Sequence, residues 1–96
     1  MKIMISQPMR GKTEQQIKEE RKELVKRLEE EGYEVLNTVF EDFTEDKTPI
    51  YYLAKSIEFL DKADSVLFMK GWEKARGCKI EHQVACEYGK DIKYCN

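Results

Sequence analysis

The sequence is poor in proline, glycine and histidine, and it contains no long apolar run. It has 2 prolines, 5 glycines and 1 histidine in 96 residues, without internal repeats or low-complexity tracts. No segment approaches the about 20 consecutive apolar residues of a membrane span. The apolar run at the N-terminus is short and is interrupted by Pro8, so it does not resemble a signal sequence. We therefore expect no association with a membrane.

Paired cysteines are absent as well. Cys78, Cys86 and Cys95 form no C-x-x-C pair, and an odd number of cysteines without a signal peptide favours reduced thiols in the cytosol. The single histidine, His82, cannot complete a usual zinc site with cysteines at these spacings. We expect a cytoplasmic protein without a metal, in which Cys78 and Cys86 act as small packing residues.

No charge of one sign dominates. The 17 basic and 19 acidic residues are intermixed and give a formal net charge of −2, whereas proteins that bind polymeric nucleic acid usually present a basic face. A chain of 96 residues suits one domain. Such a chain buries only about 60–65% of the surface that its unfolded form exposes, so its core is small. A small core favours a homodimer or a larger homo-oligomer.

Hydrophobic periodicity alternates between strand and helix patterns along the chain. Short apolar runs predict strands at residues 2–6, 33–36, 64–69 and 91–94. Helical spacing between start and stop signals predicts helices at residues 13–31, 48–63 and 77–88. Regular alternation of strands and helices implies a parallel sheet with right-handed crossovers. We therefore predict an α/β fold, a flavodoxin- or Rossmann-like three-layer sandwich whose four parallel strands lie in the order 2-1-3-4.

Capping signals and apolar stripes define the three predicted helices. Thr13 with Gln16 forms a capping-box pattern, and Thr48-Pro49 is an N-cap followed by a proline at the first helical position. In each helix the apolar residues recur at the spacing of one face. These residues are Ile17, Leu24, Val25 and Leu28 in the first helix, Leu53, Ile57, Leu60 and Ala63 (with Ser56 among them) in the second, and Ile80, Val84 and Tyr88 in the third.

Ligands of open parallel sheets bind outside the carboxyl ends of the strands, near the point where the strand order reverses. The loops at residues 6–12, 37–47 and 70–76 meet at this edge. The first loop precedes a helix N-terminus, which attracts anions, and Arg10 can pair with a phosphate; a solvent-exposed turn is an equal alternative. The long acidic loop at residues 37–47 is either a functional lid or a patch on the edge of the core.

Glu81 lies in the first turn of the third predicted helix, at the margin of its apolar stripe. The helix dipole and nearby N–H groups favour an ionised carboxylate there. Such a carboxylate suits nucleophilic attack on an electrophilic carbon, or the anchoring of a hydroxyl, although many acidic residues in first turns only stabilise their helix. Trp72 in the preceding loop can stack on a base or a sugar, or it anchors the loop or a subunit contact.

Two segments carry a family resemblance. The opening ISQPMRGKTEQQI and the segment SIEFLDKADSVLFMKGWEKARGCKIEHQVACEYGK, with the spacing between them, resemble a group of small bacterial and phage proteins described as nucleoside 2-deoxyribosyltransferase-like. The pattern GW-x-x-A-x-G-C-x-x-E-H is specific to this group. The resemblance covers nearly the whole chain, so residues 1–96 are expected to form a single nucleoside 2-deoxyribosyltransferase-like domain.

The characterised members of this superfamily are nucleoside 2-deoxyribosyltransferases and deoxynucleoside 5′-monophosphate N-glycosidases. In them a strand aspartate precedes a G-x-x-x-E-x-G-x-A pattern. The resemblance implies that Glu81 is the nucleophile that attacks the anomeric carbon of the deoxyribose, and that Asp64 holds the sugar or assists proton transfer. Gln83 replaces the second glycine of the pattern. The serine that contacts phosphate has no counterpart here, so Arg76 is the candidate anion contact.

The loops at the sheet edge supply the expected substrate-binding residues, and by resemblance three of them occupy the places of a phosphate-side loop: Ser6, Arg10 and Gly11. The full set is Ser6, Gln7, Arg10, Gly11, Trp72, Glu73, Arg76 and Gly77. The expected function is hydrolysis of an N-glycosidic bond or transfer of a 2′-deoxyribosyl group, on (deoxy)nucleosides or their monophosphates, without a cofactor. Two alternatives stay open: a non-catalytic nucleotide-binding module, and a phage or bacterial regulatory protein with an interaction face at Phe40, Phe43 and Trp72.

Overall fold

A computed structural model describes residues 1–8, 11–36 and 48–95. Four strands form one all-parallel sheet in the order β2-β1-β3-β4. They are β1 (Lys2–Ser6), β2 (Glu34–Leu36), β3 (Ser65–Phe68) and β4 (Asp91–Tyr94). The predicted α/β class, the parallel sheet and its strand order are confirmed. The order reverses between β1 and β3, which are the two central strands.

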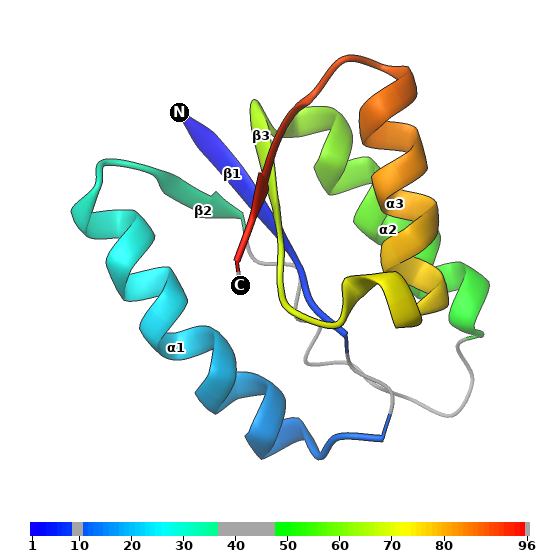
Figure 1. Cartoon of the computed structure of the whole chain (residues 1–96), viewed down its shortest axis with the longest axis horizontal. Coiled ribbons are helices and arrows are strands. Elements are labelled where there is room, and N and C mark those ends of the chain that lie inside the picture. Colours follow the sequence, from blue (N-terminus) through cyan, green and yellow to red (C-terminus); the bar gives the residue numbers. More distant parts are fainter. Residues whose placement is uncertain (9–10, 37–47, 96) are drawn as a thin grey trace.

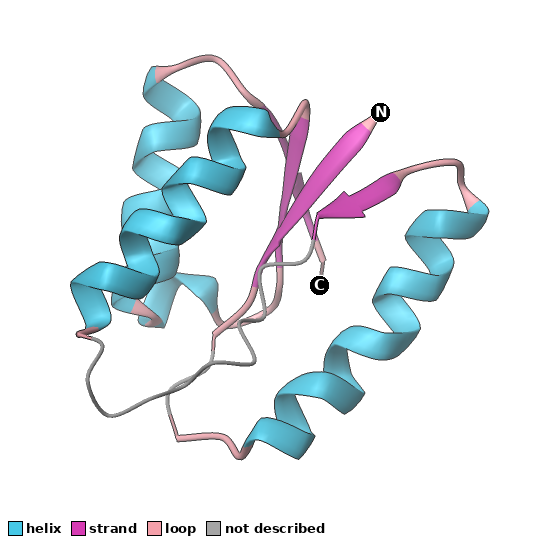
Figure 2. Ribbon diagram, turned by 180° about the vertical axis from the view of Figure 1, so that it is seen from behind, coloured by secondary structure: helices cyan, strands magenta, loops and turns pink. Residues whose placement is uncertain are grey.

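The helices cover both faces of the sheet. Helix α1 (Glu14–Glu30) packs on one face, and α2 (Pro49–Lys62) and α3 (Arg76–Glu87) pack side by side on the other (Figures 1 and 2). A short 3₁₀ helix, η1 (Trp72–Lys74), connects β3 to α3. The carboxyl ends of β1 and β3 and the first turns of α2 and α3 lie together at the lower end of the molecule in Figure 1. This is the edge at which the sequence predicts a site.

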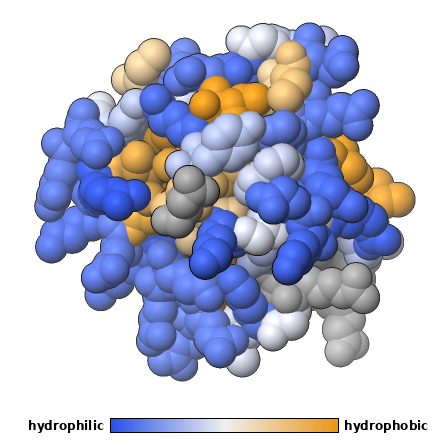
Figure 3. Space-filling model, in the orientation of Figure 1, coloured by the Kyte–Doolittle hydropathy of each residue, from blue (hydrophilic) through white to orange (hydrophobic). Residues whose placement is uncertain are grey.

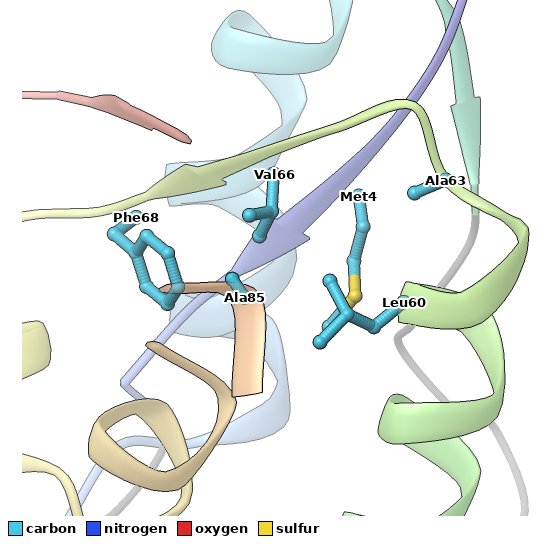
Figure 4. Close-up of a cluster of buried hydrophobic side chains, with 6 residues drawn as sticks. All are labelled: Met4, Leu60, Ala63, Val66, Phe68 and Ala85. Atoms are coloured by element: carbon cyan, nitrogen blue, oxygen red, sulfur yellow. The ribbon is translucent and has the colours of Figure 1, made fainter. Parts of the chain in front are cut away.

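The central strands are apolar on both faces because helices cover both faces. Toward α2 and α3, Met4, Val66 and Phe68 form a buried cluster with Leu60, Ala63 and Ala85 (Figure 4). Toward α1, Ile3, Ile5 and Leu67 pack with Leu24 and Leu28. Alternate residues of β1 and β3 therefore enter different halves of the core, which is why these strands appear in the sequence as continuous apolar runs.

Helix α1 begins and packs as the sequence predicts. The Thr13 side chain accepts a hydrogen bond from the backbone N–H of Gln16, and the Gln16 side chain accepts one from the backbone N–H of Thr13. Its buried apolar residues are Ile17, Leu24 and Leu28, and Val25 packs beside them. Arg21 is also buried on this face and donates to the carbonyl oxygen of Leu36 at 3.3 Å. Burial lowers the pKa of Arg21 to about 10, because desolvation disfavours the charged form.

The predicted apolar stripe of α3 is confirmed only at Val84, which is partly buried and packs against the cluster around Phe68. Ile80 and Tyr88 are 39% and 79% exposed, and the buried residues of the helix are Cys78, Glu81 and Ala85. These side chains are small except for that of Glu81, and Ala85 contributes to the cluster around Phe68. Small side chains let α3 pack close to the sheet. The periodicity of large apolar residues therefore identified the buried face of α3 only in part. Cys86, predicted to be a packing residue, is exposed.

The surface is predominantly polar. On the face shown in Figure 3, hydrophilic side chains cover most of the molecule, and the hydrophobic surface is divided into small separate patches. Within the described ranges, no helix combines the length and the apolar character that crossing a lipid bilayer requires.

Replacing Phe68 by alanine tests whether the cluster under α2 and α3 holds the fold together. Phe68 is fully buried, so Phe68→Ala should lower the free energy of unfolding by about 3–5 kcal/mol through lost burial and the remaining cavity. Tyr88→Ala, at an exposed aromatic, should change it by no more than about 0.5 kcal/mol. Urea unfolding measured by circular dichroism compares the two variants, and equal losses would contradict this packing.

Candidate functional site

A cleft of about 510 Å³ opens at the carboxyl edge of the sheet, as expected for an open parallel sheet. Its walls come from the end of β1, from one side of α2 and from the first turns of α3. Ser6 and Gln7 lie at the end of β1, and Tyr52 and Ser56 line the wall made by α2. Glu81 lies in the cleft and is contributed by α3. The volume is within the range of cavities that hold small molecules.

Glu81 is the central polar group of this cleft. Its side chain is 7% exposed, and the Ser6 hydroxyl donates a hydrogen bond to its Oε2 atom at 2.5 Å. A second hydroxyl, that of Ser56, lines the same cleft. Burial raises the pKa of Glu81, while the two hydroxyls act in the opposite direction by stabilising the ionised form. Helix α3 therefore holds a sheltered carboxylate against the end of β1.

Cys78 is a neutral neighbour of Glu81 in the cleft. Burial raises the pKa of the Cys78 thiol to about 11, and the nearby Glu81 charge adds to this effect. The thiol is therefore neutral at physiological pH. The Ser6 hydroxyl has one proton to donate, and it donates that proton to the Glu81 carboxylate.

Gln7 contributes a second buried polar group. Its side chain is 5% exposed, and its amide nitrogen donates to the carbonyl oxygen of Ile17 at 2.9 Å. Its Oε1 atom has no hydrogen-bond partner among the described residues. An unsatisfied buried acceptor costs free energy. A ligand or water in the cleft that donated an N–H or O–H to this atom would remove that cost.

The first turn of α3 presents positive charge to the cleft. The helix begins after Ala75 without a side-chain cap, so its first N–H groups are not satisfied by a capping side chain. Among the residues that the structure describes, the cations that line the cleft are Lys74, Arg76 and Lys79. Arg76 and Lys79 lie in the first helical turn, where the helix dipole disfavours cations. Uncapped N–H groups and clustered cations together suit an anionic part of a ligand.

An aromatic cluster lies beside the cleft instead of inside it. Trp72 stacks on His82 with ring centroids 4.1 Å apart, and it also contacts Phe68. The His82 Nε2 atom and the Tyr94 hydroxyl are 2.7 Å apart. Trp72 does not line the cleft, so it anchors η1 to α3 and β4, which was the alternative to base stacking. Gly71, directly before η1, adopts a φ of 93°, a left-handed conformation that favours glycine.

The structure brings together five of the residues that the sequence predicts for the site. Ser6, Gln7, Arg76, Gly77 and Glu81 all line the cleft. Trp72 and Glu73 belong to η1 and do not line it. Gly11 is exposed in the loop before α1 and has a φ of 81°. Arg10 lies outside the described residues, and so does the long loop at residues 37–47.

The structure does not bring Asp64 to the cleft. Asp64 is exposed and precedes β3, where its carboxylate accepts a hydrogen bond from the backbone N–H of Lys2 at 2.8 Å. Glu81 instead contacts Ser6, the last residue of β1. The two carboxylates are therefore at opposite ends of the sheet, because the length of the central strands separates them. The prediction that Asp64 acts beside Glu81 is corrected accordingly.

Several residues of the cleft were not among the predicted site residues, notably Ser56, Lys74 and Lys79. For Ser56 a signal was present: it is a hydroxyl within the apolar spacing of α2. For the two lysines no signal distinguished them from the many other surface cations. Within the described parts of the chain, no group of three or more His, Cys, Asp and Glu side chains is placed to hold a metal ion.

The fold and the cleft define a three-layer α/β domain with a buried carboxylate at the carboxyl edge of its parallel sheet. The chain belongs to the DUF4406 family, a domain of unknown function, whose family model matches residues 1–94. Comparison with curated proteins and with solved structures found no match.

The buried carboxyl predicts a specific dependence of stability on pH. Because burial raises the pKa of Glu81 above its ordinary value of 4.5, the folded protein binds this proton more tightly than the unfolded chain does. The resulting stabilisation is complete below pH 4.5 and is lost as the pH rises through the folded-state pKa. The free energy of unfolding of the wild type, relative to that of Glu81→Gln, should therefore fall as the pH rises above 4.5.

Urea unfolding at a series of pH values measures this difference directly. Glu73→Gln is the matched control, because it removes one exposed carboxylate outside the cleft. Its unfolding free energy should follow that of the wild type at each pH. A constant difference between the wild type and Glu81→Gln across the series would show that Glu81 titrates alike in the folded and unfolded states.

Proposed function

We propose that this chain hydrolyses the N-glycosidic bond of (deoxy)nucleosides or their 5′-monophosphates, or transfers their 2′-deoxyribosyl group to another base. Glu81 is the nucleophile in this proposal. The observation that carries the proposal is the buried carboxylate of Glu81, held by Ser6 in a cleft at the carboxyl edge of the sheet. The resemblance of the segments around Ser6 and Glu81 to the nucleoside 2-deoxyribosyltransferase superfamily supports the same chemistry.

The proposed reaction has two steps. An oxygen of the ionised Glu81 carboxylate bonds to the anomeric carbon, the bond from that carbon to the base nitrogen breaks, and the base departs with the electron pair and takes up a proton. Water or an acceptor base then attacks the same carbon, the bond to the carboxylate oxygen breaks and restores ionised Glu81, and the attacking group loses one proton to solvent, which balances the proton taken up by the departing base. A negative charge in a sheltered site stabilises the positive charge that develops on the sugar. Ser6 contributes by holding the carboxylate in position.

The charges around the cleft support a substrate with an anionic group. Lys74, Arg76 and Lys79 gather near the uncapped N-terminus of α3. A 5′-phosphate bound there would be stabilised by both the cations and the helix dipole. The arrangement favours monophosphates over uncharged nucleosides as substrates.

A second candidate function is nucleotide binding without turnover. It is favoured by the position of Asp64, because Glu81 is the only carboxylate that lines the cleft among the described residues. A departing base then meets no second carboxyl group there that could donate a proton. Calorimetry with deoxynucleoside monophosphates distinguishes the two functions: binding that persists in Glu81→Gln, without base release by the wild type, would favour the binding module.

Base release is the direct test of the proposed reaction. Incubation with deoxynucleosides and their 5′-monophosphates, followed by chromatography of the free base, should show turnover by the wild type. Glu81→Ala and Glu81→Gln should each lower the rate by at least about 10³-fold, because they remove the nucleophile. Asp64→Asn is the control and should retain turnover, since Asp64 lies at the other end of the sheet. Absence of free base with every common base would contradict the proposal.

The anion site has its own test. Arg76→Ala and Lys79→Ala should each raise KM for a 5′-monophosphate about 10-fold, which corresponds to the loss of one hydrogen bond to a charged group. The effect on the matching nucleoside should be much smaller. Lys70→Ala is the matched control, because it removes an exposed cation that does not line the cleft. Equal effects on both substrates would place the phosphate elsewhere.

A further inference from the structure

The apolar stripe of α3 lies on the surface except at its middle residue. Ile80, Val84 and Tyr88 follow one another at intervals of four residues, so they lie along one side of the helix up to its C-cap. Val84 packs partly against the core, whereas Ile80 and Tyr88 are 39% and 79% exposed. None of the three lines the cleft that contains Glu81. The candidate site therefore gives this stripe no role.

A groove of about 530 Å³ runs beside the stripe, between the second half of α2 and the second half of α3. The two helices lie side by side on the sheet (Figure 1). The ammonium group of Lys90 is bound within the chain, because it donates to the carbonyl oxygens of Asp61 and Ala63 at 3.2 and 2.9 Å. The walls are mainly apolar, and the residues that line the groove are Ile57, Leu60, Asp61, Val84, Tyr88 and Lys90.

The stripe is complementary to itself in an antiparallel pair of helices. Its outer members, Ile80 and Tyr88, are each four positions from Val84. When α3 of a second copy lies antiparallel across the stripe, with Val84 at the two-fold axis, Ile80 of each copy meets Tyr88 of the other. Each contact of a two-fold interface occurs twice. Both grooves then receive an isoleucine side chain, and apolar surface leaves water on both copies.

The charges beside the stripe fit the same arrangement. Lys79 and Glu87 are exposed, and with Gln83 between them they lie along one flank of the stripe. Eight residues separate them by about 12 Å along the helix, which is too far for an ion pair within one copy. Among the described residues, neither has an ion-pair partner. In the antiparallel pair, Lys79 of each copy approaches Glu87 of the other.

We propose that this chain forms a two-fold symmetric dimer through the stripe of α3 and the groove between α2 and α3. Two antiparallel α3 helices form the centre of the interface. Ile80 of each copy enters the groove of the other, and two pairs of Lys79 with Glu87 fix the antiparallel direction. The dimer adds buried apolar surface to a chain whose own core is small.

Sedimentation velocity of the full chain over a series of concentrations tests the stripe. The wild type should sediment with the mass of two chains. Ile80→Glu and Tyr88→Glu should each remain monomeric where the wild type is dimeric, because each places a charge in both halves of an apolar contact. Both residues are exposed in the single chain, so circular dichroism should show an unchanged fold. Ile50→Glu is the matched control and should remain dimeric, since Ile50 is 76% exposed in the first turn of α2, outside the groove.

Charge reversal tests the antiparallel direction. Lys79→Glu and Glu87→Lys should each raise the dissociation constant of the dimer about 10-fold, because each turns two attractive pairs into repulsive ones. The double variant that carries both changes restores opposite charges across the interface, so its dissociation constant should return to that of the wild type. Recovery can arise only between copies, because the two residues do not meet within one chain. No substrate is present, so the result is independent of the proposed function.

Three results would overturn the proposal. A wild type that is monomeric at every concentration would leave the groove to another protein. A dimer that persists in both Ile80→Glu and Tyr88→Glu would place the interface elsewhere on the chain. A double charge-reversal variant that dissociates as readily as the single variants would contradict the antiparallel pairing of Lys79 with Glu87.

Discussion

The hydrogen bond from Ser6 to Glu81 is the interaction around which the cleft is built. It joins the last residue of β1 to the first half of α3, across 75 positions in the sequence. The bond exists because Cys78, Glu81 and Ala85 form the face that α3 turns to the sheet, in place of the larger apolar residues of that helix. A carboxylate takes a place that packing alone would give to an apolar side chain. The polar character of the cleft and the surroundings of Cys78 both follow from this substitution.

The same interaction links stability to function. Burying a carboxylate costs free energy, and the hydroxyls of Ser6 and Ser56 offset only a part of that cost. The surrounding structure compensates through the cluster of Phe68, Leu60 and Val66, which fixes α2 and α3 on the sheet directly beside the cleft. A buried ionisable residue that destabilises the fold, and is held in place by its neighbours, is typical of a functional site.

The sequence predicts the fold well, because the fold depends on local and repeated signals. The apolar runs at Met4 and Val66 and the caps at Thr13 and Thr48 each determine one element, and alternation of elements determines the parallel sheet. The face of α3 could not be predicted in this way, because the large residues Ile80 and Tyr88 lie outside the core and small residues lie inside it. The spacing of large apolar side chains is a poor guide to the buried face of a helix that packs closely against a sheet.

The site is only partly predictable, for a different reason. Glu81 and Ser6 follow from the rule that ligands bind at the carboxyl ends of parallel strands. Asp64 was assigned by its place in a family pattern, and its true position follows from the strand that it precedes. Ser56 lines the cleft with Glu81 only once α2 is packed beside α3, so no spacing in the sequence places it there.

The central claim is that Glu81 forms a bond to the sugar, and a slowed substrate tests it most directly. A 2′-fluoro-2′-deoxynucleoside 5′-monophosphate carries an electron-withdrawing group that destabilises a positively charged sugar and prolongs any covalent intermediate. After incubation, mass spectrometry of the tryptic peptide Ile80–Lys90 should show the added mass of one fluorodeoxyribosyl phosphate on Glu81. The adduct should be absent from Glu81→Gln. Base release by the wild type without an adduct, or with an adduct on another residue, would contradict the account.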